Sequence, residues 1–158
     1  MSSTKRDTCR FCGSSDLECF LDLGNHPPSN SFLRREQIHL ESRYPLRTFF
    51  CKGCFLVQLL DVVSGKEIFD NYDYLSSTSR ALVNHYTQMT QYLSSRFDLK
   101  EDEVVVDIGC NDGITLNTYE VPNLQKIGIE PSKVVEVARE SGLQVINSFF
   151  SKEVAEKV

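Results

Sequence analysis

The chain of 158 residues lacks any apolar run long enough to cross a membrane, and its polar beginning, MSSTKRDT, has no signal-peptide core. It also lacks the excess of basic residues that phosphate binding needs, because its net charge at pH 7 is −5. These absences predict a cytoplasmic protein with neither a membrane nor a nucleic-acid partner. In that compartment thiols stay reduced, so paired cysteines more often bind a metal than form disulfides.

Four of the six cysteines form two C-x-x-C pairs, Cys9 with Cys12 and Cys51 with Cys54. Two residues between cysteines allow a tight turn to point both sulfurs at one ion, and two such turns complete a tetrahedral thiolate shell. The spacing predicts a structural zinc ion with no open position for catalysis, although spacing alone leaves an iron–sulfur centre open. Four incidental buried cysteines would not explain the pairing. The two remaining cysteines lack metal-ligand spacing and are predicted to be small apolar fillers: Cys19 and Cys110.

The segment around the cysteine pairs predicts short strands at residues 17–23, 46–50 and 55–60. The last strand is expected to pair back across the second cysteine pair as a hairpin. This pattern indicates a zinc ribbon in residues 1–63, which depends on its metal because so small a segment buries little core. Two prolines predict an irregular loop over residues 24–30, in which His26 is expected to be exposed.

A helical connector is predicted for residues 64–100. Ser64-x-x-Glu67 fits a capping box that opens a short helix. The run at residues 69–77, rich in aromatic and hydroxyl side chains, interrupts the helical periodicity, and its chemistry alone favours an anchored loop over a ligand-binding one. Ser79 is a predicted N-cap, and the helix after it carries apolar residues at helical spacing that predict a core-facing stripe: Leu82, Tyr86, Met89, Leu93 and Phe97.

Strands and helices alternate over residues 101–158. The continuous apolar run at residues 104–108 is typical of a strand buried on both faces of a parallel sheet. The order strand, helix, strand, helix, strand, helix predicts the first half of a Rossmann-like domain, of class α/β, with three parallel strands. The other expected strands and helices are at residues 114–119, 126–130, 131–140 and 144–147, followed by a last helix capped by Ser151.

A glycine-containing turn at residues 109–113 follows the first of these strands, and Glu130 ends the second. Such a turn lets a ligand approach the backbone, and the acidic residue can accept hydrogen bonds from ribose hydroxyls. The turn lacks the G-x-G-x-x-G pattern of a dinucleotide site. Asp107 and Asp112 would repel phosphates and attract the ammonium group of S-adenosylmethionine, so the charge favours this methyl donor. A purely structural turn stays open.

With both patterns in hand, the chain resembles the C-methyltransferases that act on nucleotide-linked deoxysugars. That family begins with a zinc-binding domain, continues into a class I methyltransferase domain and ends in a further domain. The resemblance covers nearly the whole chain and rests on the order and spacing of several motifs: Cys9-x-x-Cys12-Gly13, Asp22-Leu23-Gly24-Asn25-His26-Pro27-Pro28-Ser29-Asn30, Tyr44-Pro45-Leu46, Cys51-x-x-Cys54-x-x-Val57-Gln58-Leu59, Tyr72-x-Tyr74-x-Ser76-Ser77, Asp107-Ile108-Gly109-Cys110-Asn111-Asp112-Gly113 and Gly128-Ile129-Glu130-Pro131-Ser132.

The resemblance implies which residues bind S-adenosylmethionine. Glu130 would contact its ribose, although the family often has aspartate there, and Tyr74 and Ser77 would close over the ligand. The methionine part would be surrounded by residues of the strand end and turn: Asp107, Gly109, Asn111, Asp112 and Gly113. The full enzyme would remove a proton next to a ketone of a nucleotide-linked sugar, and the enolate would attack the methyl group.

The family's catalytic segment follows the fourth strand of the sheet, a part that this chain does not include. We therefore expect a truncated product or fragment that contains no catalytic residue and shows no methyl transfer alone. The open edge of the strand at residues 104–108 would be apolar and unpaired, which favours self-association. Two other functions stay open: a zinc ribbon without enzymatic activity that binds a protein or nucleic acid, and a zinc-containing NAD-dependent enzyme.

Overall fold

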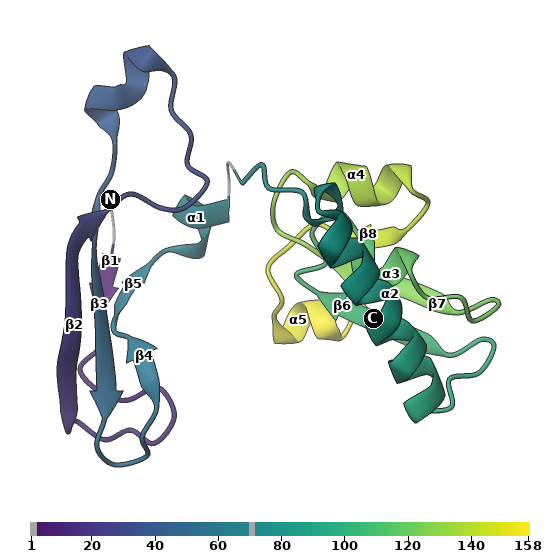
Figure 1. The fold of residues 1–158 in the computed structure, drawn as a ribbon, viewed down its shortest axis with the longest axis horizontal. Helices are drawn as coiled ribbons and strands as arrows, with labels where there is room; N and C mark the ends of the chain where they lie inside the picture. Colours follow the sequence, from purple (N-terminus) through teal and green to yellow (C-terminus); the bar gives the residue numbers. More distant parts are fainter. Residues whose placement is uncertain (1–2, 70–71) are drawn as a thin grey trace. The chain divides into compact units, whose positions relative to one another are not determined.

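The computed structural model describes residues 3–69 and 72–158. It divides into two compact units, Met1–Ile68 and Phe69–Val158 (Figure 1). The helical connector expected at residues 64–100 contributes to both, and its expected boundaries stay predictions. Asp70 and Asn71, within the predicted loop at residues 69–77, lie outside the described residues. None of the helices in the described part of the chain has the length and hydropathy of a membrane span.

The first unit is a zinc ribbon built on antiparallel strands. Its larger sheet has the order β2 (Leu17–His26), β3 (Tyr44–Cys51) and β4 (Val57–Leu59), all antiparallel. The predicted hairpin across the second cysteine pair is therefore confirmed. A second, two-stranded antiparallel sheet, which the sequence did not predict, pairs β1 (Ser3–Lys5) with β5 (Asp61–Val63).

Strand β2 runs further than predicted, through Gly24–His26. The pairing with β3 shifts its register between Asp22 and Asn25, and the Gly24 amide donates a hydrogen bond to Asp22 Oδ1 at 2.8 Å. Because Gly24 has a φ of +79°, which glycine adopts without strain, the strand bends there and then resumes its pairing. The loop prediction is wrong for Gly24–His26, whereas His26 is exposed as expected. A short 3-10 helix, η1 (Arg35–Leu40), was not predicted.

The first unit buries few side chains, as predicted for a segment of this size. Its buried apolar side chains include two of the paired cysteines, and the set is Cys9, Tyr44, Phe49, Cys51 and Leu60. Cys19 is exposed, so its assignment as an apolar filler is wrong. A core this small leaves much of the folding free energy to be supplied by a metal ion.

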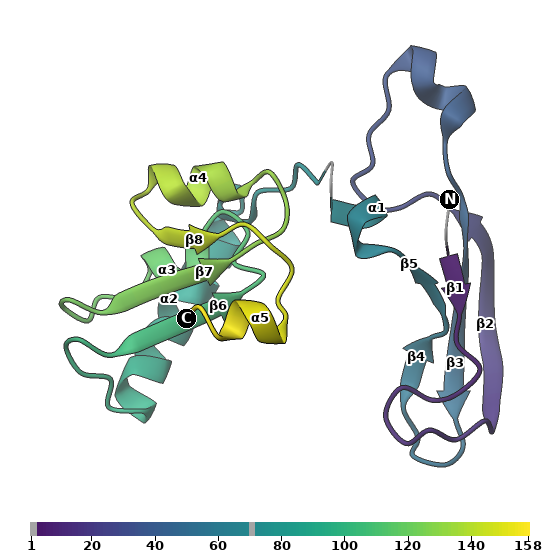
Figure 2. The same ribbon diagram turned by 180° about the vertical axis from the view of Figure 1, so that it is seen from behind.

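The second unit is half of a Rossmann-like domain. Its parallel sheet has the order β6 (Val104–Ile108), β7 (Gln125–Ile129) and β8 (Gln144–Ile146), which confirms the predicted alternation. Helix α2 passes in front of the sheet in Figure 1 and behind it in Figure 2, so it covers one face. The helices of the unit after residue 79 are α2 (Arg80–Arg96), α3 (Ile114–Asn117), α4 (Val135–Glu140) and α5 (Lys152–Ala155).

The predicted helix caps are present. The Ser64 hydroxyl accepts from the Glu67 amide at 3.2 Å before α1 (Gly65–Phe69). The Ser79 hydroxyl accepts from the Leu82 amide at 3.4 Å before α2, and Ser151 accepts from the Val154 amide at 3.3 Å before α5. Helix α3 is shorter than expected, and α4 begins four residues later than expected, at Val135, because the residues after Glu130 first form a turn around its carboxylate.

The apolar stripe of α2 packs as predicted except at its end. Leu82, Tyr86, Met89 and Leu93 are half-buried, but Phe97 lies beyond the helix and is 66% exposed. The residue of α2 that is fully buried is Thr90, whose hydroxyl donates to the Thr118 carbonyl at 3.1 Å.

Strand β6 lies at the edge of the sheet, and no strand among the described residues pairs with its other side. Val104, Val106 and Ile108 are 48%, 39% and 56% exposed, so the expectation of burial on both faces is wrong for these residues. The open apolar edge is as expected. Self-association through it stays a prediction.

Two glycines allow the elements of the second unit to pack closely. A Cβ at Gly113, which caps α3 with a φ of +80°, would lie 2.3 Å from Leu143 Cδ1. A Cβ at Gly128 in the central strand β7 would lie 2.5 Å from the sulfur of Cys110. Cys110 is buried as predicted, and it fills the space that Gly128 leaves.

Replacing Gly128 by alanine is therefore expected to destabilise the second unit by roughly 1–3 kcal/mol, the usual cost of overpacking. The clash is with the sulfur of Cys110, so Gly128→Ala should cost less in a Cys110→Ala background. Amide hydrogen exchange in β7 measures the loss in free energy of unfolding that Gly128→Ala causes in each background. Equal losses in the two backgrounds would contradict the packing described above.

Candidate functional site

The four paired cysteines converge on one point. Their sulfur atoms all lie within 4.8 Å of one another, and Cys9–Cys54 and Cys12–Cys51 sulfurs are each 3.6 Å apart. Tetrahedral zinc with Zn–S bonds of about 2.3 Å separates its sulfurs by roughly 3.8 Å. A cluster of several iron atoms would hold the thiolates further apart. The sulfur atoms therefore fit a single ion, and four thiolates suit zinc.

Each cysteine pair is held by a tight turn. In the first, the Gly13 amide donates to the Cys9 carbonyl at 3.0 Å, and Gly13 has a φ of +75°, which glycine adopts without strain. In the second, the Phe55 amide donates to the Cys51 carbonyl at 2.8 Å, and Phe55 itself carries the positive φ of +65°. Gly53 serves packing, because a Cβ there would lie 3.3 Å from Ser14 Cβ.

Gln58 supports the cluster and was missed as a functional residue in the sequence. It is buried in β4, four residues after Cys54, and its Nε2 donates to the Cys9 sulfur at 3.1 Å. Its Oε1 accepts from the Arg10 amide at 3.0 Å, which fixes the orientation of the carboxamide. Residues that orient metal ligands in this way also tune their basicity.

The pKa values of two cysteine thiols in the cluster are shifted in opposite directions. Hydrogen bonds from the Cys12 amide, with further ones from Phe11 and Gln58, lower the pKa of the Cys9 thiol to about 6. The Leu56 amide lowers the pKa of Cys54, but burial and the three neighbouring cysteines outweigh it and raise this pKa to about 12. The neighbouring thiols thus oppose the ionisation of Cys54, and a divalent ion that binds the four sulfurs as thiolates removes that opposition.

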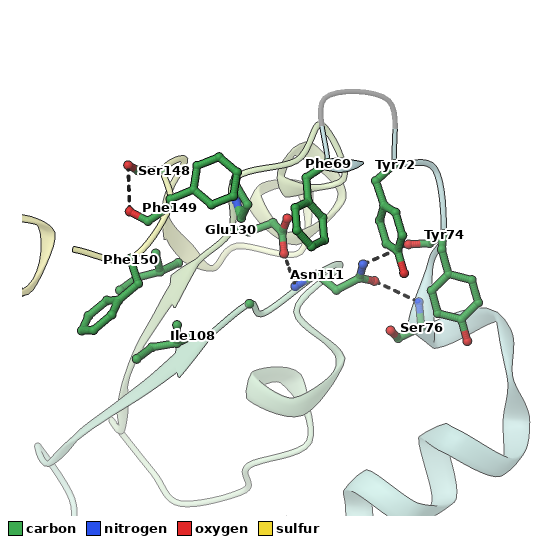
Figure 3. Close-up of a pocket in the computed structure, with 13 residues that line it drawn as sticks. Phe69, Tyr72, Tyr74, Ser76, Ile108, Asn111, Glu130, Ser148, Phe149 and Phe150 are labelled. Atoms are coloured by element: carbon green, nitrogen blue, oxygen red, sulfur yellow. Dashed lines mark hydrogen bonds between the residues drawn. The ribbon is translucent and has the colours of Figure 1, made fainter. Parts of the chain in front are cut away.

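A pocket of about 380 Å³ lies in the second unit at the carboxyl ends of the parallel strands (Figure 3). Open parallel sheets bind ligands at this edge, and the volume falls within the range of about 300–1,000 Å³ common for small-molecule sites. Of the predicted cofactor residues, four line it: Tyr74, Gly109, Asn111 and Glu130. The pocket is also lined by residues that the sequence analysis did not single out for binding, among them Phe69, Ile108, Pro131, Phe149 and Phe150.

Glu130 is the buried carboxylate of this pocket, with only 5% of the residue exposed. One carboxylate oxygen accepts from the Asn111 amide at 3.0 Å and the other from the Ser132 amide at 2.8 Å. A carboxylate offers about four acceptor positions. Each oxygen of Glu130 can therefore accept one more hydrogen bond, which matches a vicinal diol such as that of ribose.

Gly109 forms an open part of the pocket wall. It has a φ of +81°, and a Cβ placed on it would meet no atom within 4 Å. Its amide donates to the Ile129 carbonyl at 2.7 Å, so the bare backbone is fixed in place. A ligand can approach this backbone closely, as the sequence predicted.

The other predicted cofactor residues do not line the pocket. Asp112 is 4% exposed, and its carboxylate accepts from the Ser77 amide at 2.8 Å and the Ile114 amide at 3.3 Å. Gly113 packs against Leu143, as described above. Asp107 is half-buried, and burial raises the pKa of its carboxyl, against a hydrogen bond from Thr115.

The carboxylates near the turn also act on Cys110, the second residue of the turn. Burial, with added repulsion from Asp107, Glu130 and Asp112, raises the pKa of the Cys110 thiol to about 12. Carboxylates that repel the negative charge of a thiolate would also disfavour a phosphate in the same place.

A chain of aromatic rings borders the pocket. Phe149 meets Phe69 at a centroid distance of 6.1 Å, Phe69 meets Tyr72 at 5.6 Å, and Tyr72 meets Tyr74 at 6.3 Å, all edge to face. Phe149 is far from Phe69 in the sequence and meets it only through the tertiary fold. The sequence therefore did not predict that Phe149 borders the pocket. The row offers apolar area suited to a flat heterocycle.

Two comparisons with known proteins bear on the family. Residues 9–69 match the family model described as "Putative zinc binding domain", named Methyltransf_13. Over 154 residues the chain is 27% identical to C-methyltransferase NovU of Streptomyces niveus. The aligned region covers 96% of this chain and 37% of that protein. The chain thus spans little more than a third of its relative. Together the two matches support the C-methyltransferase family that the motifs predicted, and they place a zinc-binding domain in residues 9–69.

Proposed function

We propose that the second unit binds S-adenosylmethionine and that the chain serves in the C-methylation of a nucleotide-linked keto-deoxysugar, with zinc in a structural role. The observation that carries the proposal is the pocket at the carboxyl edge of the parallel sheet, where a buried carboxylate keeps free acceptor positions beside an open glycine. The methyl donor supplies an electrophilic methyl group, and the chain supplies a site that binds and orients it.

Each part of the pocket matches one part of the proposed cofactor. The free acceptor positions of Glu130 suit the ribose hydroxyls. The apolar and aromatic walls at Phe69, Pro131 and Phe149 suit an adenine ring and exclude water from it. The bare backbone of Gly109 gives room for the methionine part.

Charge separates this cofactor from a dinucleotide. S-adenosylmethionine carries a sulfonium and an ammonium group and no phosphate, so the negative potential around the 109–113 turn attracts it. The same potential opposes the pyrophosphate of NAD. A zinc ribbon without enzymatic activity is not favoured, because the similarity to a C-methyltransferase extends over both units.

The acceptor is the part of the proposal that rests on similarity. The printed name of the relative specifies transfer to carbon. The motifs shared with enzymes of nucleotide-linked deoxysugars suggest that the acceptor carbon is activated by a neighbouring ketone.

Calorimetry with S-adenosylhomocysteine tests the cofactor. We expect binding of S-adenosylhomocysteine by the wild-type chain and no binding of NAD or of a short oligonucleotide. Glu130→Gln should weaken binding by about tenfold or more, since a hydrogen bond to a charged group contributes roughly 1.5–3 kcal/mol.

Glu140→Gln, at an exposed position in α4, is the matched control and should bind like the wild type. Because Glu130 also accepts hydrogen bonds from two backbone amides of its own chain, the fold of each variant is checked by amide exchange in β7. Binding of NAD in preference to S-adenosylhomocysteine would overturn the cofactor assignment.

The structural role of zinc has its own test. The purified chain should contain one zinc ion, and a strong chelator should unfold β2–β4 while the amides of β6–β8 keep their protection, because the second unit has its own core. Cys51→Ser should lose the metal. Cys19→Ser, at an exposed cysteine outside the cluster, should retain it. Full zinc content in Cys51→Ser, or acid-labile sulfide in the protein, would contradict the site.

A further inference from the structure

The segment from Tyr72 to Thr78 forms one wall of the pocket but has little structure of its own. Tyr72, Tyr74 and Ser76 line the pocket, and the regular part of the segment is a single 3-10 turn, η2 (Ser76–Thr78). Such a short turn does not hold a wall in place by itself. Its position must come from contacts with another part of the unit.

Those contacts come from two adjacent side chains of the glycine turn. Asn111 Oδ1 accepts from the Ser76 amide at 3.0 Å, and Asn111 Nδ2 donates to the Tyr74 carbonyl at 2.9 Å (Figure 3). Asp112 Oδ2 accepts from the Ser77 amide at 2.8 Å. Three hydrogen bonds thus fix the backbone of Tyr74–Ser77 to a segment more than 30 residues away in the sequence.

Asn111 also joins this wall to the proposed ribose-binding carboxylate. Its own amide donates to Glu130 at 3.0 Å, while its side chain holds Tyr74 and Ser76. The residue has a φ of +52°, a left-handed conformation that asparagine tolerates better than most residues. A carboxamide can accept from one backbone amide and donate to a carbonyl at once, which neither a carboxylate nor an apolar side chain can do.

We propose that Asn111 and Asp112 are positioning residues, which act on the cofactor by clamping the Tyr74–Ser77 segment over the pocket. Asp112 is buried and makes no contribution to the pocket lining, so its effect passes through Ser77. Asn111 couples the segment to Glu130. This inference rests on the proposed function, since it deepens the account of the same site.

Coupling of this kind works in both directions. A ligand on Glu130 makes the clamp more favourable, and an ordered clamp makes the site more favourable to the ligand, by the same factor. S-adenosylhomocysteine should therefore slow exchange of the Ser76 and Ser77 amides, and loss of the clamp should weaken S-adenosylhomocysteine binding.

Residue-resolved amide exchange by NMR on the full chain tests the clamp. In the free wild type, the Ser76 and Ser77 amides should be protected. Asn111→Gly removes the carboxamide without straining the left-handed backbone, and should speed exchange at Ser76 about fivefold or more, as expected for one lost hydrogen bond. It should also weaken S-adenosylhomocysteine binding by a similar factor, while the β7 amides exchange as in the wild type.

Asn123→Gly is the matched control, because Asn123 is an exposed asparagine with a φ of +51° away from the pocket lining. It should leave the Ser76 and Ser77 amides unchanged. If Asn111→Gly does not fold, Asn111→Asp serves in its place: it keeps an acceptor for Ser76, loses the donor to Tyr74, and should weaken ligand-induced protection of the segment.

Two results are decisive. Unprotected Ser76 and Ser77 amides in the wild type, or wild-type exchange in the folded Asn111 variant, would overturn the clamp. Failure of the wild type to bind S-adenosylhomocysteine, with both amides protected and released by the Asn111 variant, would overturn the proposed function and leave the clamp standing.

Discussion

The second unit depends on one buried carboxylate at the end of its central strand. Glu130 holds the amides of Asn111 and Ser132, and through them it fixes the turn after β6 and the turn before α4. Asn147, which follows β8, donates to the carbonyls of Glu130 and Ser132 and brings in the third strand end. A charge this deeply buried is tolerated because hydrogen bonds satisfy it. The arrangement that stabilises the carboxylate therefore also shapes the pocket and leaves part of its accepting capacity free.

The first unit depends on a different interaction, the convergence of four cysteine sulfurs on one site for a metal ion. Metal binding there would compensate for the small hydrophobic core of so short a segment. The two turns bring four sulfurs to within bonding reach of one ion, and Gln58 holds the Cys9 sulfur from the sheet side. With all four positions taken by cysteine, no open coordination site is left for a substrate, which fits a metal that serves the fold.

Much of this could be predicted from the sequence, because the relevant signals are local. The cysteine spacing, the caps at Ser79 and Ser151, the strand at residues 104–108 and the acidic end of β7 each depend on a few adjacent residues. Predictions failed where tertiary contacts decide. Strand β2 continues past a bulge because β3 pairs with it again at Asn25 and His26. Phe149 follows β8, so its place in the pocket depends on the pairing of β8 with the sheet.

The roles of the acidic residues show the same limit most clearly. From the sequence, Asp107, Asp112 and Glu130 are three similar carboxylates near one turn. In the structure the Asp112 carboxylate accepts hydrogen bonds from the Ser77 and Ile114 amides, and Asp107 lies outside the pocket lining. Glu130 is therefore the carboxylate that lines the pocket. Residue type predicted the sign of the charge, but only the hydrogen-bond partners distinguish a structural carboxylate from one that can bind a ligand.

A crystal structure of the chain soaked with S-adenosylhomocysteine would test the central claim most directly. The account predicts ribose hydroxyls within hydrogen-bond distance of both Glu130 oxygens, and the adenine against the aromatic row that includes Phe69 and Phe149. A ligand bound elsewhere, or a nucleotide phosphate seated on the Gly109–Gly113 turn, would contradict it.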